Sequence, residues 1–335
     1  MRYIELTGSW RQIGRRHGEA FADDIRRCYE FYCVRYGKTP DKLHPTIRSY
    51  VETRLPNAAE EIEGIAEGAG MTYEEVLVYN HFNVITGCTP IFFRRSNVGV
   101  LVAQNLDCER EELQAVVVRK VRPTKGHAFL GVSFVGTVWV GNFINDAGLC
   151  GAGVSAHHEH YRTEDGTSGG IVGAAVAQQA GSVDEAFEIM NSHRNLGKVG
   201  VHLLATPDGR AILVEGDADR KYRTDVTGDF AFTTGLYTTG HVQARDEPAY
   251  IRPKVARAKT IEALYRSGEI AFTVAGMKAV LGHHAADPGS ICRHDPRHGQ
   301  CTQSGRILIA GQGKLLITEG PPCTAAFQEF ALKGQ

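Results

Sequence analysis

Cys88 stands at a position where its type and its neighbours suggest a nucleophile. It lies in the stretch VITGCTPIFF, where a polar, helix-like leader gives way to a long β-rich remainder. One strand later, AQNLDCE places Asn105 and Asp107 near a strand end, and far downstream SICRH supplies Arg293. A thiol with a base or a cation nearby is the arrangement that activates a catalytic cysteine. The alternative is a buried structural cysteine, with Asp107 and Arg293 forming a surface ion pair.

Two stretches rich in histidine raise the question of a metal site. The first, SAHHEHY, contains His157, His158 and His160. The second, ICRHDPRHGQC, contains the string C-x-H-x3-H-x2-C, formed by Cys292, His294, His298 and Cys301. The first follows a strand into a polar loop. The second is too compact, because structural zinc sites usually separate two ligand pairs by about a dozen residues or more. The sequence therefore predicts neither a metal nor a cofactor.

The glycine-rich stretches GAGVS and SGGIVG lack the strand–GxGxxG–helix context of a dinucleotide site. The second opens a predicted helix, and the N-terminus of a helix can hold an anion. Close packing of this helix against a sheet explains its small residues equally well, so both interpretations stay open.

The periodicity of the chain shows which elements position these residues. Before Cys88, apolar residues recur about every four positions from Ile13 to Tyr32, and two more helices follow Pro56 and Thr72. After Cys88 come short β-branched runs, among them TVWVGNF at 137–143, then two helices, a hairpin, more helices and final strands. This order predicts an α+β fold in which helices enclose two sheets. No linker or repeat interrupts it, so one domain over residues 1–335 is the simplest organisation.

Composition narrows the classes of partner. Lys and Arg number 37 against 38 Asp and Glu, for a formal net charge of −1. This balance gives no electrostatic reason to expect nucleic acid or an anionic membrane as a partner. The stretch MRYIELTGSWRQIG lacks the apolar core of a signal peptide, and no later run approaches a membrane span. We therefore expect a cytoplasmic protein whose eight cysteines are thiols, most of them buried.

A series of short motifs runs along nearly the whole chain. In order, they are LTGSWRQIGRRHGEAF, AEEIEGIAEGAGMTYEEVLVYN, GCT, AQNLD, NDAGL, SICRH and GPPC. Together they resemble the acyl-coenzyme A:6-aminopenicillanic acid acyltransferase-like family of N-terminal-nucleophile (Ntn) hydrolases. The first is similar to the family's opening G-[ST]-x-x-x-[IL]-G-x-x-H-G, GCT resembles its cleavage point, and AQNLD resembles its Q-N-x-D.

The resemblance implies a four-layer αββα sandwich, the Ntn-hydrolase fold, with a helical N-terminal segment. It also implies that the chain cuts its own bond between Gly87 and Cys88. Residues 1–87 would then form a small chain and residues 88–335 a large chain that carries the nucleophile, held together without a covalent bond. Cutting there gives Cys88 an α-amine with a pKa of about 7.7–8.0, close to the thiol value of about 8.5. This amine can serve as a general base attached to the nucleophile.

Roles for neighbouring residues follow from the same resemblance. The Asp107 carboxylate would orient the new amine, and a backbone N–H near Leu106 would face the oxyanion. Arg293 would lie close to the thiolate, and Asn105 would support this geometry. Where the family shows Thr-Asn-His, this sequence reads TTGH, so Gly240 has no side chain to donate. The Gly240 N–H, Asn145 or Asn142 then become candidate donors to the oxyanion.

The resemblance thus implies a self-processing amide hydrolase that forms an acyl thioester on Cys88. Its substrate would be a small linear N-acyl or aminoacyl amide, with the SGGIVG helix and the loop 157–160 lining the pocket. Two alternatives stay open: an acyltransferase that moves an acyl group from a thioester such as acyl-coenzyme A to a small amine, and a non-catalytic binding protein. Cys108, where the family often has an aromatic residue, leaves the identity of the substrate open.

Overall fold

The computed structural model describes residues 1–81, 87–108, 115–197, 199–242, 244, 248–294 and 301–333. Its helices are α1 (Trp10–Tyr32), α2 (Pro45–Arg54), α3 (Pro56–Ala69), α4 (Tyr73–Tyr79), α5 (Gly169–Gln179), α6 (Val183–Asn191), α7 (Pro248–Arg266) and α8 (Val274–Leu281). Its strands are β1 (Arg2–Gly8), β2 (Thr89–Ser96), β3 (Gly99–Cys108), β4 (Val116–Pro123), β5 (Phe129–Phe134), β6 (Asn142–Asn145), β7 (Cys150–Ala156), β8 (Val199–Ala205), β9 (Ala211–Gly216), β10 (Lys221–Asp225), β11 (Phe230–Phe232), β12 (Cys301–Ile309), β13 (Lys314–Thr318) and β14 (Phe327–Ala331).

The strands form two sheets. One has eight strands in the order β1-β4-β5-β6-β7-β8-β9-β10, and the other has six in the order β11-β2-β3-β12-β13-β14. In the eight-stranded sheet, β1 pairs with β4 in parallel. In the six-stranded sheet, β2 and β3 are antiparallel, with Thr89 opposite Asn105. Strand β3 pairs on its other edge with β12. Strand β2 lies between β11 and β3, so the strand that follows Cys88 lies inside the six-stranded sheet and not at its edge.

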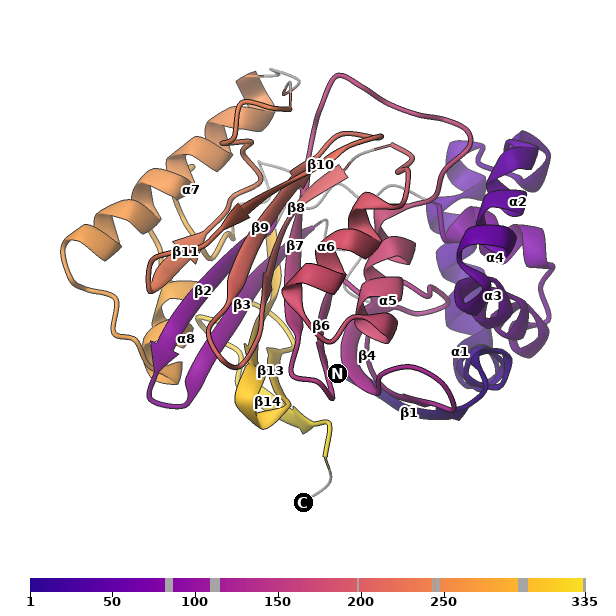
Figure 1. Ribbon diagram of the computed structural model, residues 1–335, viewed down its shortest axis with the longest axis horizontal. Helices are drawn as coiled ribbons and strands as arrows, with labels where there is room; N and C mark the ends of the chain where they lie inside the picture. The colour runs from indigo at the N-terminus through magenta and orange to yellow at the C-terminus, as the bar shows by residue number, and fades with distance from the viewer. Residues whose placement is uncertain are drawn as a thin grey trace.

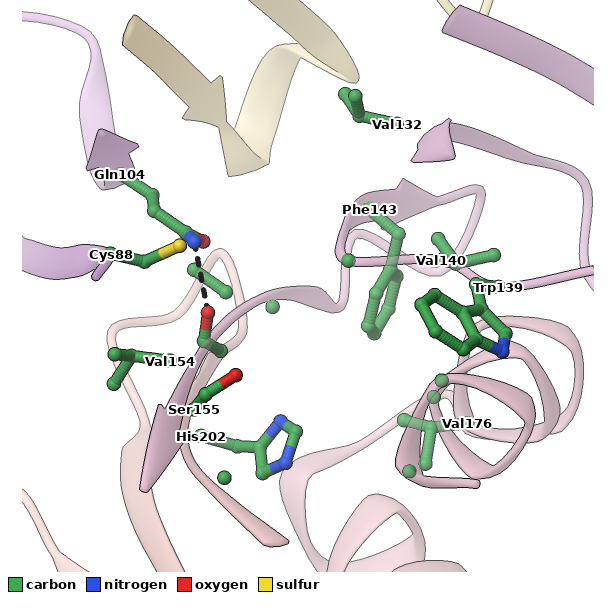
Figure 2. A pocket seen from close by; sticks show the side chains of 18 of the residues that line it. Cys88, Gln104, Val132, Trp139, Val140, Phe143, Val154, Ser155, Val176 and His202 are labelled. Carbon is green, nitrogen blue, oxygen red and sulfur yellow. Dashed lines mark hydrogen bonds between the residues drawn. The ribbon is translucent and has the colours of Figure 1, made fainter. Parts of the chain in front are cut away.

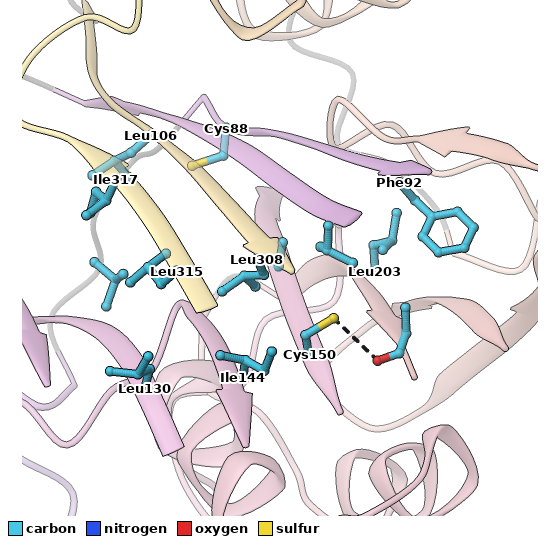
Figure 3. Close-up of a cluster of buried hydrophobic side chains, with 14 of the residues drawn as sticks. Cys88, Phe92, Leu106, Leu130, Ile144, Cys150, Leu203, Leu308, Leu315 and Ile317 are labelled. Atoms are coloured by element: carbon cyan, nitrogen blue, oxygen red, sulfur yellow. Dashed lines mark hydrogen bonds between the residues drawn. The ribbon is translucent and has the colours of Figure 1, made fainter. Parts of the chain in front are cut away.

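The two sheets pack face to face over an apolar core (Figure 3). The six-stranded sheet contributes Phe92, Leu106 and Leu308, and the eight-stranded sheet contributes Ile144 and Leu203. Burial of side chains from alternate positions of each strand follows from the period of two in a β-strand. Cys88 belongs to this core, at the end of the layer where β2 begins.

Helices cover both outer faces. Helices α5 and α6 pack on the eight-stranded sheet, and α1, α3 and α4 pack beside them. Helices α7 and α8 cover the six-stranded sheet through contacts such as Met277 with the face that carries Ile91. Figure 1 shows these layers, with the N-terminal helices on one side of the molecule and α7 and α8 on the other. The predicted α+β fold with four αββα layers is confirmed.

The N-terminal segment is joined tightly to this sandwich. Gly14 on α1 and Gly64 on α3 let the two helices touch, because a Cβ at either position would overlap the backbone of the other helix. Glu61 on α3 forms an ion pair with Arg119 on β4, and both side chains are buried. His17 accepts a hydrogen bond from the Gly136 N–H at 3.1 Å. Gly14 and His17 of the opening motif therefore serve to pack α1 against α3 and against the sandwich.

The observed elements depart from the expected ones at three places. Strand β1 and helix α2 were not expected. The expected strand TVWVGNF forms only in its last two residues, which begin β6. Trp139 is instead held in a loop, where its indole N–H donates to the Asn80 carbonyl at 2.9 Å and to Ser168 Oγ at 3.0 Å. These tertiary hydrogen bonds outweigh the local preference of the β-branched neighbours of Trp139 for a strand.

The cysteines are all free thiols, as expected, and six of the eight are buried. Among the described residues, no helix has the length and apolar character that crossing a membrane requires.

Candidate active site

Cys88 immediately precedes β2 and is only 2% exposed. The Gly87 N–H donates to the Asp107 carbonyl at 2.9 Å, which continues the antiparallel ladder of β2 and β3 past its last assigned pair. Gly87, the residue before the peptide bond to Cys88, is thus held against β3. Cys88 and Leu106 both project into the space between the sheets.

A cavity of about 200 Å³ opens beside Cys88. Figure 2 shows Cys88 and Gln104 at one end of this cavity and Trp139 and Val176 at the other. Its wall is mostly apolar and includes Val140, Phe143, Val154, Met190 and Leu204. Such a space favours an apolar group of a ligand and excludes water from the thiol.

Glycines create the room in this cavity. Gly153, from the GAGVS stretch, lines it, and a Cβ there would lie 2.7 Å from His202 Nδ1. Gly170, from the SGGIVG stretch, also lines it, and a Cβ there would lie 2.5 Å from Trp139 Cδ1. Both glycine-rich stretches therefore serve the cavity wall. The loop 157–160 does not contribute to the lining described, and His158 stacks on Tyr161 instead, with ring centroids 5.0 Å apart.

A chain of buried polar side chains reaches the thiol end of the cavity. Arg306 Nη1 donates to Asn142 Oδ1 at 2.6 Å, and Asn142 Nδ2 donates to Gln104 Oε1 at 2.7 Å. Gln104 Nε2 then donates to the Gly153 carbonyl at 2.9 Å (Figure 2). Because Gln104 lies directly opposite Arg306 in the ladder of β3 and β12, the sheet fixes this network as a unit. It places an amide and a guanidinium on the face that carries the Cys88 thiol.

Two titratable groups in the cavity wall respond to burial. Burial lowers the pKa of the Arg306 guanidinium to about 10, although the Cys88 and Cys108 thiolates oppose the shift. Arg306 still carries its charge at neutral pH. Burial, helped by the positive charge of Lys221, lowers the pKa of His202 to about 4. His202 is therefore a neutral imidazole at neutral pH.

Asp107 lies on the other face of β3, towards α7 and α8. Its carboxylate is buried and contacts Arg257 Nη1 at 3.1 Å and Arg293 Nη1 at 3.8 Å. Thr302 Oγ1 also donates to it, at 2.7 Å. Burial raises the pKa of Asp107, and the two guanidinium groups with the Thr302 hydroxyl oppose this rise. The structure thus brings Asp107 and Arg293 together in the interior and not as a surface ion pair.

Asn105 ties this cluster to α8. Its side-chain amide donates to the Leu281 carbonyl at 2.8 Å and to the Ile291 carbonyl at 2.9 Å. The second of these bonds fixes the backbone two residues before Arg293. Asn105 therefore occupies a supporting position.

Two expected oxyanion donors lie elsewhere. The Asn145 amide donates to the Ala177 carbonyl at 3.2 Å and to the Ala180 carbonyl at 2.7 Å, on the helix side of the eight-stranded sheet. It is therefore occupied away from Cys88. Gly240 is exposed and lies outside the described cavity lining. Of the candidates, Asn142 is the one that joins the network beside the thiol.

Comparisons with known proteins give fold-level likenesses only. No protein-family model and no curated protein matches the sequence. Among solved structures, a mutant of conjugated bile acid hydrolase from Clostridium perfringens is 12% identical, with a TM-score of 0.43 over 74% of this chain and 97% of that chain. An N-acylethanolamine-hydrolyzing acid amidase ortholog from Caenorhabditis elegans is 13% identical, with a TM-score of 0.47 over 67% of this chain and 93% of that chain. Penicillin V acylase from Agrobacterium tumefaciens is 13% identical, with a TM-score of 0.44 over 69% and 83%. At such values the chemistry of this chain has to be argued from its own residues.

Sequence reasoning gave no role to Gln104 of the AQNLD motif, and it missed three further residues of the site. Arg257, on α7, carries the shorter contact to Asp107. Arg306 lies in the apolar run GRILIAG, which begins in β12, and the sequence analysis assigned it no role. A charged residue inside such a run does indicate a buried polar network. Trp139 was assigned to a strand. All three come from segments far from Cys88 in sequence, so no local spacing reveals them.

Proposed function

We propose that the chain is a self-processing N-terminal-cysteine amide hydrolase that forms an acyl thioester on Cys88. The substrate is a small linear N-acyl amide with an apolar acyl group. The observation that carries the proposal is the position of Cys88. It lies at the start of a central strand and is buried, and it faces an apolar cavity beside the Gln104 amide.

The processing step is an N-to-S acyl shift. The Cys88 thiol attacks the carbonyl carbon of Gly87, the peptide nitrogen takes up the thiol proton, and the C–N bond breaks. Water then hydrolyses the thioester, which leaves a carboxylate on Gly87 and a free α-amine on Cys88. The hydrogen bond from the Gly87 N–H to the Asp107 carbonyl holds the residue before the bond in the sheet during this step.

Turnover uses the new amine as the base. It takes the thiol proton, Sγ attacks the substrate carbonyl, and the ammonium returns the proton to the leaving amine. Water then attacks the thioester and releases the acid. Asp107 orients the amine from the neighbouring strand, and Arg257 and Arg293 keep its carboxylate in place.

The oxyanion that forms during acylation needs hydrogen-bond donors beside Cys88. The backbone N–H of Leu106 is one candidate. The Gln104 amide is the other, because an NH2 group has two donors and the bond to the Gly153 carbonyl uses only one of them. Asn142 and Arg306 fix the orientation of the Gln104 amide from the opposite side.

The two products of processing stay together as one enzyme. The buried ion pair between Glu61 and Arg119 joins the segment 1–87 to the segment 88–335. Contacts of α1 and α3 with Val117 and Ile171 add apolar surface to the same boundary. The large chain then carries the nucleophile, and the small chain supports its outer helical layer.

Intact mass spectrometry under denaturing conditions tests the proposal. The native sequence should give two species, the larger beginning at Cys88, whereas Cys88→Ala should give one full-length species. Cys150→Ala is the matched control, because Cys150 is buried in the same inter-sheet core, and it should process normally. A single full-length mass for the native sequence, with a thiol at Cys88 that electrophiles do not label, would support a non-catalytic binding protein instead.

A further inference from the structure

A second cluster of thiol and imidazole groups lies apart from the Cys88 thiol, at the surface near the end of α8. His284, Cys292, His294 and Cys323 each direct one ligand atom into it, and these four atoms all lie within 4.8 Å of one another. They come from three segments: the loop after α8, the residues around Arg293, and the turn between β13 and β14. Cys292 is buried and the other three are exposed, so an ion can reach the site.

We propose that these four residues bind one zinc ion. In a tetrahedral site with Zn–S of about 2.3 Å and Zn–N of about 2.0–2.1 Å, a sulfur and a nitrogen ligand lie about 3.5 Å apart. His294 Nε2 lies 3.5 Å from Cys292 Sγ and 3.1 Å from Cys323 Sγ. The His284 and His294 rings approach with centroids 5.1 Å apart. The two separations from His294 to the thiols are thus close to those of a zinc site, and all four ligand atoms lie within 4.8 Å of one another.

The donor set also suits zinc. Two thiols and two imidazoles form the Cys2His2 set of structural zinc sites. Binding of Zn2+ displaces one proton from each thiol, so the two thiolates balance the charge of the ion and the site becomes neutral. The same soft donors disfavour Mg2+ and Ca2+, which prefer oxygen ligands.

The zinc site differs from the string that the sequence suggested. Of its four members, Cys292 and His294 belong to the cluster. Cys301 instead donates its thiol to the His294 carbonyl at 3.6 Å, and His298 lies outside the described residues. The other two ligands lie outside the string: His284 precedes it in the loop after α8, and Cys323 comes from the turn between β13 and β14.

A zinc ion here holds Arg293 in place. Arg293 lies between two of the ligands in sequence, and its guanidinium contacts Asp107. Its backbone N–H donates to Thr302 Oγ1 at 2.8 Å, and the same hydroxyl donates to Asp107. The metal would therefore tie the turn at Cys323 and the loop after α8 to the residues that surround the Asp107 carboxylate. Zinc binding itself does not depend on the activity proposed for Cys88.

Elemental analysis of the full chain, purified without chelators under reducing conditions and free of any histidine tag, tests the site. The expected result is one zinc ion per chain, and cobalt(II) reconstitution should give the visible absorption of a tetrahedral thiolate site. Cys323→Ser should retain less than about a tenth of the metal. Cys301→Ser, a neighbouring thiol outside the cluster, should retain all of it. Removal of zinc by a chelator should lower the melting temperature of the native chain and leave that of Cys323→Ser unchanged.

Two results would overturn the proposal. One is a native chain that holds less than about a tenth of an equivalent of zinc even after reconstitution with ZnCl2 under reducing conditions. The other is equal metal content in the native chain and Cys323→Ser, which would place any zinc elsewhere. Both readouts are independent of catalysis, so they separate a failure of the zinc site from a failure of the hydrolase proposal.

Discussion

Gly170→Ala tests whether the cavity beside Cys88 holds the acyl group. The new Cβ would lie 2.5 Å from Trp139 Cδ1 and 2.6 Å from Cδ2. Carbon atoms in contact normally stay about 3.5 Å apart or more, so the indole has to retreat by about 1 Å. Its N–H is held at 2.9 Å by the Asn80 carbonyl and at 3.0 Å by Ser168 Oγ. A shift of this size strains or breaks both bonds.

The free-energy cost of moving the indole follows from these contacts. Overpacking of a buried site costs about 1–3 kcal/mol, and each hydrogen bond contributes about 1 kcal/mol. A long acyl chain reaches the displaced indole and has to push it further, so part of this cost is added to the activation free energy for that chain. Each 1.4 kcal/mol added lowers the rate about tenfold. We therefore expect the rate for long acyl chains to fall by one to two orders of magnitude, whereas an acetyl group, which does not reach Trp139, keeps its rate.

The assay compares acyl chloromethyl ketones from acetyl to decanoyl as covalent labels of Cys88, with the rate followed by intact mass. Gly311→Ala is the matched control, because Gly311 is exposed and a Cβ there meets nothing within 4 Å. A Gly170→Ala variant that labels at the native rate with every chain length would refute the assignment of this cavity to the acyl group.

Three further predictions concern stability, pH and the oxyanion. Glu61→Gln leaves the buried Arg119 without its charge partner, so urea unfolding should show a loss of about 3–5 kcal/mol, whereas the exposed Glu63→Gln should cost less than about 1 kcal/mol. Burial lowers the pKa of His202 to about 4, below its unfolded value of about 6.5, so stability is full above pH 6.5 and declines as the pH falls towards 4. His202→Gln should flatten that decline in urea titrations at several pH values, and an unchanged slope would contradict it. Gln104→Leu should lower kcat by about 10²–10³-fold if its amide stabilises the oxyanion, and native kcat would exclude that role.

The features of the fold that the sequence predicts are local ones. The change of period at Cys88 located the start of the β-rich portion, because helical and strand spacings differ. The helix expected after Thr72 does begin there, with a capping box between Thr72 and Glu75, which lie within one helical turn. Gly70 ends α3 with a φ of 65°, a left-handed conformation that glycine adopts easily. In each case the interaction that fixes the structure lies within a few residues.

The remaining parts depend on contacts between distant segments. Trp139 leaves the expected strand because Asn80 and Ser168 bind its indole. Arg306 reaches the Cys88 face through strand pairing with Gln104. The cluster around His294 draws Cys323 from a turn near the C-terminus. None of these partners is marked by spacing in the sequence, so only the folded chain identifies them.

Trapping the acyl intermediate tests the central claim most directly. The native chain is mixed with an apolar N-acyl amide, quenched in acid and digested, and the peptides are sequenced by tandem mass spectrometry. We predict an acyl thioester on a peptide whose N-terminal residue is Cys88, with its α-amine free. An acyl group on any other residue, or on Cys88 while its bond to Gly87 is still intact, would contradict the claim that processing creates the catalytic base.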